Sequence, residues 1–71
     1  MAVSVYKVIE IIGTSDQSWE DAAVTAVKKA AESLRDLRVA EVVQQDLSIE
    51  DGGAVTYRTK LNVSFKYEGG Q

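Results

Sequence analysis

The fold is decided by the stretch QQDLSIEDGGAVTYRTK at residues 44–60. Its two halves are rich in alternating apolar and polar side chains, and they flank Glu50-Asp51-Gly52-Gly53. Adjacent glycines between two such runs are a strong signal for a hairpin, because they adopt the backbone angles that a tight turn requires. We therefore expect two antiparallel strands, over residues 38–49 and 54–67.

Pairing through this turn predicts a register. If facing residues have numbers that sum to about 104, Asp46 lies opposite Arg58, Gln44 opposite Lys60, and Leu47 opposite Tyr57. The odd-numbered face is then apolar, with Val39, Val43, Leu47, Ile49, Val55, Tyr57, Leu61, Val63 and Phe65. The even-numbered face is mixed or polar, with Ala40, Val42, Gln44, Asp46, Ser48, Thr56, Arg58, Lys60, Asn62 and Ser64.

A strand and a helix are expected before the hairpin. Residues 3–12 are rich in β-branched side chains and end before Gly13, which predicts a first strand. Ser18 followed by Asp21 resembles a capping box, so a helix should begin at about Trp19. Apolar residues then recur at helical spacing on one face: Trp19, Ala23, Ala26, Val27, Ala30, Ala31, Leu34 and Leu37.

The element order predicts an α+β domain that spans residues 1–71, a β-α-β-β unit with one helix on a three-stranded sheet. The first two strands run in the same direction, so an antiparallel sheet requires the third strand between them, in the order 1-3-2. One helix covers one face. The other face carries Tyr6, Val8, Ile12 and Val42 among polar groups, which suits subunit contacts or a bound ligand.

Composition excludes several functions. The chain has 71 residues, a net charge of −3, and no cysteine or histidine. Disulfides, thiolate nucleophiles and Cys-ligated metals are thereby excluded, and the commonest general base is missing. The charge disfavours nucleic acid, and no apolar run is long enough to span a membrane. No secretory signal is present, so we expect a cytoplasmic protein that gains stability by oligomerising.

Four ordered motifs carry a family resemblance. They are VYKVIEIIGTS at residues 5–15, SLRDLR at 33–38, EVV at 41–43 and YRTKLNVSF at 57–65. Together they resemble the dodecins along nearly the whole chain. The resemblance implies a hollow homododecamer of β-α-β-β subunits that binds and stores a small ligand, flavin in most members, without catalysis.

The flavin positions depart from the family pattern. The tryptophan that stacks on flavin in the dodecins is replaced by Val39, and a glutamine that binds the polar edge of the flavin is replaced by Arg58. Gln45 lies near the same site by resemblance. A cross-strand ion pair with Asp46 is the simpler role for Arg58. The single tryptophan, Trp19, is interpreted as a packing anchor and not as a displaced flavin platform.

The stretches 18–20, 38–40, 45–46 and 56–58 resemble a subgroup of dodecins that lacks the tryptophan and binds calcium. Calcium needs six to eight oxygen ligands, which symmetry-related subunits can supply together. The candidate ligands are Glu20, Glu41, Asp46, Glu50 and Asp51. Solvation of the turn is the simpler role for the last two.

The sequence thus favours a calcium-binding dodecin-like shell in which the flavin site is degenerate. Three alternatives stay open at this point: a dodecin that stores riboflavin or FMN, a structural assembly without a ligand, and a small enzyme. The enzyme is disfavoured because no phosphate-binding loop and no paired catalytic groups stand out.

Overall fold

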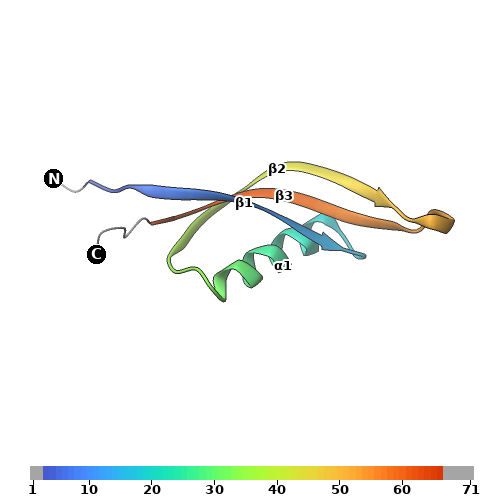
Figure 1. The fold of residues 1–71 in the computed structure, drawn as a ribbon, viewed down its shortest axis with the longest axis horizontal. Helices are drawn as coiled ribbons and strands as arrows, with labels where there is room; N and C mark the ends of the chain where they lie inside the picture. Colours follow the sequence, from blue (N-terminus) through green and yellow to red (C-terminus); the bar gives the residue numbers. More distant parts are fainter. Residues whose placement is uncertain (1–2, 67–71) are drawn as a thin grey trace.

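The computed structural model describes residues 3–66 and confirms the predicted β-α-β-β order. The elements are β1 (Tyr6–Ser15), α1 (Trp19–Ala31), β2 (Leu37–Ile49), the short 3-10 turn η1 (Asp51–Gly53) and β3 (Val55–Lys66). Both strand pairings are antiparallel and the sheet order is β1-β3-β2, as predicted (Figure 1). The predicted end of the third strand, residue 67, lies outside the described residues.

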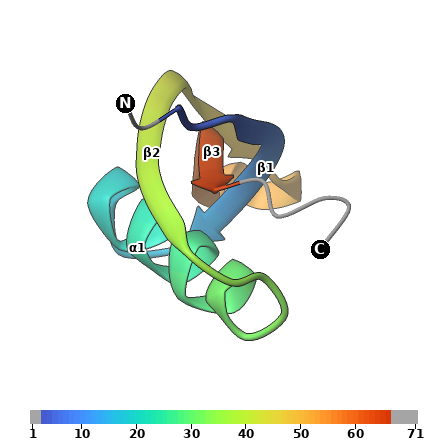
Figure 2. The same ribbon diagram turned by 90° about the vertical axis from the view of Figure 1, so that its left-hand side faces the viewer.

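The core is thin and lies between α1 and one face of the sheet (Figure 2). The buried side chains are Ala22 and Ala26 of α1 with Thr59, Leu61 and Val63 of β3. Ile9 and Ile11 of β1 pack against them and are partly buried. The helix packs mainly on β1 and β3 and barely touches β2, so part of β2 is uncovered on the helix side.

The ends of α1 differ from the prediction in detail. Ser18 caps the helix, because its hydroxyl accepts a 2.9 Å hydrogen bond from the main-chain nitrogen of Asp21. The Asp21 carboxylate does not complete a capping box; it accepts a 2.6 Å bond from the Ser15 hydroxyl. The helix ends at Ala31, where short-range bonds such as Glu32 N to Lys29 O tighten the last turn. The predicted apolar stripe beyond residue 31 is therefore not helical.

Gly13 was expected to end the first strand, but β1 continues to Ser15 and Gly13 pairs with Thr59. A Cβ atom at Gly13 would lie 2.1 Å from the main-chain oxygen of Ala22 and 2.8 Å from the Cβ of Ala26. The glycine therefore serves close approach of the helix to the sheet. The strand does not need to break there.

The hairpin register is confirmed near the turn. Asp46 lies opposite Arg58, and Leu47 opposite Tyr57. Both glycines of the turn have positive φ, 87° at Gly52 and 89° at position 53, which explains why glycines stand there.

The predicted faces are wrong further along β2. Irregularities between Val42 and Gln44 and between Leu37 and Val39 shift the register. One extra residue in a strand moves the following side chains to the other face. Val42 and Ala40 therefore lie on the helix side, opposite Leu61 and Val63, and Val39 lies on the far side, opposite Ser64.

Candidate ligand-binding face

The sheet surface that faces away from α1 is the open face. The strand pairings arrange its side chains in four rows across β1, β3 and β2: Val8, Ser64 and Val39; Glu10, Asn62 and Glu41; Ile12, Lys60 and Gln44; Thr14, Arg58 and Asp46. The apolar members are well exposed, with 57% exposure at Val8 and 61% at Val39. An open surface of mixed apolar and charged groups is suited to contacts with other subunits or with a ligand.

A bidentate ion pair occupies one end of the open face. Arg58 Nε lies 2.7 Å from Asp46 Oδ1, and Arg58 Nη2 lies 3.1 Å from Oδ2. Gln44 Nε2 donates a third bond to Oδ2, at 3.3 Å. The hydrogen bond from Arg58 lowers the pKa of Asp46, and the same bond raises the pKa of Arg58. The predicted cross-strand pair is confirmed, and both oxygens of the Asp46 carboxylate are engaged.

Trp19 joins the start of α1 to the hairpin on the helix side. Its indole Nε1 donates a 3.0 Å hydrogen bond to the main-chain oxygen of Asp46. Its ring meets Tyr57 edge to face, with centroids 5.0 Å apart. The Thr59 hydroxyl donates to the main-chain oxygen of Trp19 at 2.9 Å. These contacts confirm that Trp19 is a packing anchor.

The three candidate flavin positions do not share one face. Val39 and Arg58 both lie on the open face, at rows near its two ends. Gln45 pairs with the buried Thr59, so its side chain belongs to the helix side. An aliphatic side chain at Val39 offers no ring for stacking, and the guanidinium of Arg58 cannot accept a hydrogen bond.

The five candidate calcium ligands are dispersed over the subunit. Glu20 lies in the first turn of α1, and Asp46 is bound by Arg58. Glu50 accepts a 3.1 Å bond from the Ser48 hydroxyl, and Asp51 lies at the tip of the hairpin. Within residues 3–66, no three acidic side chains come together in a way that could hold a metal ion.

Glu41 is the exception to this dispersal, because Glu10 shares its row on the open face and Asn62 lies between them. Directly facing residues in an antiparallel sheet have neighbouring side chains on one face. Glu10 was not among the sequence candidates. The register shift in β2 places the side chain of Glu41 on the open face, where Glu10 also lies. The alternation of apolar and polar residues in the sequence does not reveal that shift.

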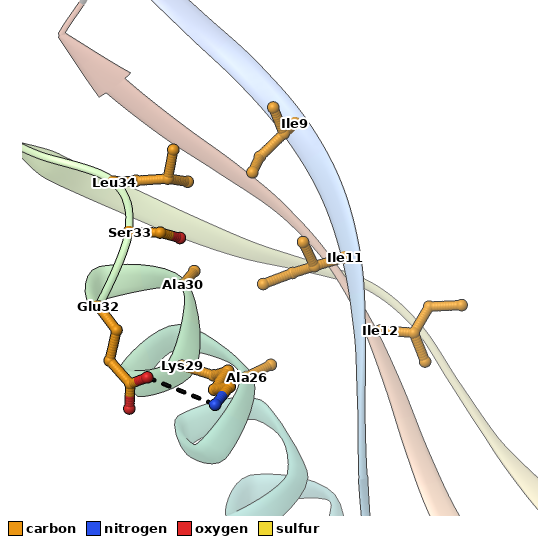
Figure 3. Close-up of a pocket in the computed structure, with 9 residues that line it drawn as sticks. All are labelled: Ile9, Ile11, Ile12, Ala26, Lys29, Ala30, Glu32, Ser33 and Leu34. Carbon is orange, nitrogen blue, oxygen red and sulfur yellow. Dashed lines mark ion pairs between the residues drawn. The ribbon is translucent and has the colours of Figure 1, made fainter.

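A groove of about 650 Å³ lies on the helix side, between β1 and the second half of α1 (Figure 3). Ile9 and Ile11 point towards the helix, whereas Ile12 points away from it. The exposed ion pair of Lys29 with Glu32, at 3.4 Å, stands at its rim. The groove is lined mainly by aliphatic side chains, so it lacks the aromatic platform that a flat ligand would use.

The fold and the open face define a small antiparallel α+β subunit with one uncovered sheet face. The dodecin family model matches residues 5–68. The calcium dodecin of Mycobacterium tuberculosis is 58% identical over 64 residues, which cover 90% of each chain. The dodecin of Thermus thermophilus is 36% identical over 64 residues, which cover 90% of this chain and 93% of that one. The chain belongs to the dodecin family.

Solved structures agree with this assignment. The crystal structure of the Mycobacterium tuberculosis calcium dodecin, described as having a novel calcium-binding site, matches with a TM-score of 0.86 and 56% identity. It covers 96% of this chain and 97% of that one. The dodecin of Streptomyces coelicolor matches with a TM-score of 0.87 and 35% identity. The match covers 96% of this chain and 97% of the Streptomyces chain. Within residues 3–66, no helix has the length and apolar character needed to cross a membrane.

Proposed function

We propose that this chain forms a homododecameric, non-catalytic shell that binds calcium ions. Dodecameric assembly is known for the dodecin family, to which the chain belongs. The 58% identity to a calcium dodecin favours calcium over flavin. The observation that carries this preference is the occupation of the flavin positions on the open face. Arg58, held by Asp46 in a bidentate pair, stands where a flavin would need an amide, and Val39 stands where it would need an aromatic ring.

The shape of the subunit supports assembly. Its radius of gyration is 14.8 Å and its extents are 56 × 21 × 16 Å. A compact domain of this length would have a radius of about 11 Å. Large apolar side chains are exposed on both strands at the sheet edges, including Val8 and Val39. Contacts between subunits would bury this surface and supply the stability that a thin core lacks.

A calcium site in this protein would be shared between subunits. Calcium takes six to eight oxygens, mainly from carboxylates, carbonyls and water. The row of Glu10, Asn62 and Glu41 places two carboxylates and an amide on the open face, which is fewer than calcium needs. Glu20, Glu50 and Asp51 remain candidates for the additional ligands. Asp46 would have to release Arg58 first, so it is the weakest candidate.

Calorimetric titration of the purified protein with calcium, and with magnesium as the control ion, tests this function. We expect binding heat with calcium that weakens in Glu41→Gln and Glu10→Gln. Glu32→Gln is the matched control, because Glu32 directly follows the last residue of α1 and pairs with Lys29 away from the open face. No heat above that of dilution would remove the calcium proposal. Light scattering tests the shell separately, and a monomer or dimer would contradict it.

A further inference from the structure

The tip of the β2–β3 hairpin is exposed at every residue from 49 to 55. It projects beyond α1 at the end of the sheet (Figure 1). Asp51 is exposed there and is followed by Gly52, whose φ is 87°. No heavy atom lies within 4 Å of the point where a Cβ of Gly52 would stand. Apart from its two neighbours in the chain, no residue therefore crowds that side of Gly52.

Asp51 differs from the other aspartates in its contacts. Asp16 accepts a bond from Gln17, Asp21 from Ser15, and Asp46 from Arg58 and Gln44. Asp36 lies 4.0 Å from Arg38. Within residues 3–66, the Asp51 carboxylate has no hydrogen bond or ion pair. It is also the one aspartate of the sequence that glycine follows.

We propose that Asp51-Gly52 is a site of spontaneous succinimide formation, which converts Asp51 to isoaspartate. The main-chain nitrogen of Gly52 attacks Cγ of Asp51 and forms a new C–N bond. One carboxyl oxygen leaves as water, taking up the proton that the nitrogen loses and a second proton from the solvent. Water then opens the five-membered ring. Cleavage of the Cγ–N bond restores aspartate, and cleavage at the main-chain carbonyl gives isoaspartate.

The surroundings of the tip favour this reaction. Ring closure requires the side chain of Asp51 to turn onto the following nitrogen, and a carboxylate without partners is free to do so. Glycine at the next position removes the Cβ that would hinder the approach. The last strand pair, Ile49 with Val55, lies outside the two residues that react. The sheet can therefore keep its pairing while the tip gains one backbone atom.

Incubation of the assembled protein at neutral pH in water enriched in oxygen-18, followed by peptide mapping and fragmentation, tests the site. We expect isoaspartate and heavy oxygen at Asp51. Asp36 is the internal control, because it is also exposed outside the helix and strands but precedes Leu37. Asp51→Glu should lose the signal, because its ring would have six members and closes far more slowly.

A synthetic peptide of residues 47–57 gives the chemical reference for this experiment. If the peptide forms isoaspartate and the protein does not, the assembled tip is held in an unreactive form and the proposal is overturned. Labelling of Asp36 at the same rate as Asp51 would also overturn it. Labelling confined to Asp51 in the protein supports it. This result does not depend on whether calcium binds, because the reaction needs no metal.

Discussion

Trp19 and Asp46, 27 residues apart in the chain, are joined by a 3.0 Å hydrogen bond from the indole Nε1 to the main-chain oxygen. The bond ties the first turn of α1 to β2, the strand that the helix touches least. Thr59 on the central strand binds the main-chain oxygen of the same tryptophan. The start of the helix is thus fixed to both strands of the hairpin.

Trp19→Phe tests this attachment. Phenylalanine keeps an aromatic ring beside Tyr57 but removes the N–H donor, so the subunit should lose about 0.5–1.5 kcal/mol of stability. Denaturant titration followed by circular dichroism, at a fixed subunit concentration, measures the change. The same substitution in a Tyr57→Leu background separates the hydrogen bond from the ring contact. Unchanged stability in Trp19→Phe would mean that the bond contributes nothing in solution.

In Asp46→Asn, the stability of the protein should depend less on pH in the acid range than it does in the wild type. Arg58 lowers the pKa of Asp46 below its ordinary value, so the folded state holds the carboxylate in its charged form. Its contribution is present at and above the ordinary pKa, and it is lost as the pH falls through the lowered value. The difference in melting temperature between wild type and Asp46→Asn should therefore shrink below the ordinary carboxyl range.

Arg58→Gln provides the matched comparison, because it removes the other partner of the same pair. Its melting curve should show the same pH trend as that of Asp46→Asn, and the double variant should add little to either. A difference from wild type that stays constant down to acid pH would contradict the assignment of this pair.

The sequence predicts the element order and the strand order because each depends on local patterns. The turn glycines fix the register as far as Gln44, where Lys60 faces it as expected. The adjacent Val42 and Val43 fit either face of a strand equally well, so alternation cannot reveal the irregularity there. That irregularity decides which residues of β2 reach the open face, including Val39 and Glu41. The residues that make up the candidate site on β2 could therefore be identified only from the structure.

Gly13→Ala should destabilise the subunit by about 1–3 kcal/mol, as overpacking typically does. The new methyl group would meet the main-chain oxygen of Ala22, which cannot move without displacing α1. Thermal denaturation measures the loss. Thr14→Ala is the control, because Thr14 is exposed on the open face and its truncation should change stability by less than about 0.5 kcal/mol. Equal effects of both substitutions would show that the helix does not approach this closely.

Flavin binding should be weak in the wild-type protein and should strengthen in Val39→Trp/Arg58→Gln. Val39 lies on the open face, so a tryptophan there would present its ring to a ligand on that face. Stacking contributes about 0.5–1.5 kcal/mol beyond burial, which is a gain of roughly 2- to 12-fold in affinity. Quenching of riboflavin fluorescence measures it. Gln45→Trp is the matched control, because position 45 belongs to the helix side and its ring should not quench. Strong quenching by the wild-type protein at micromolar riboflavin would instead mean that Val39 and Arg58 leave the flavin site intact, and calcium would lose its preference.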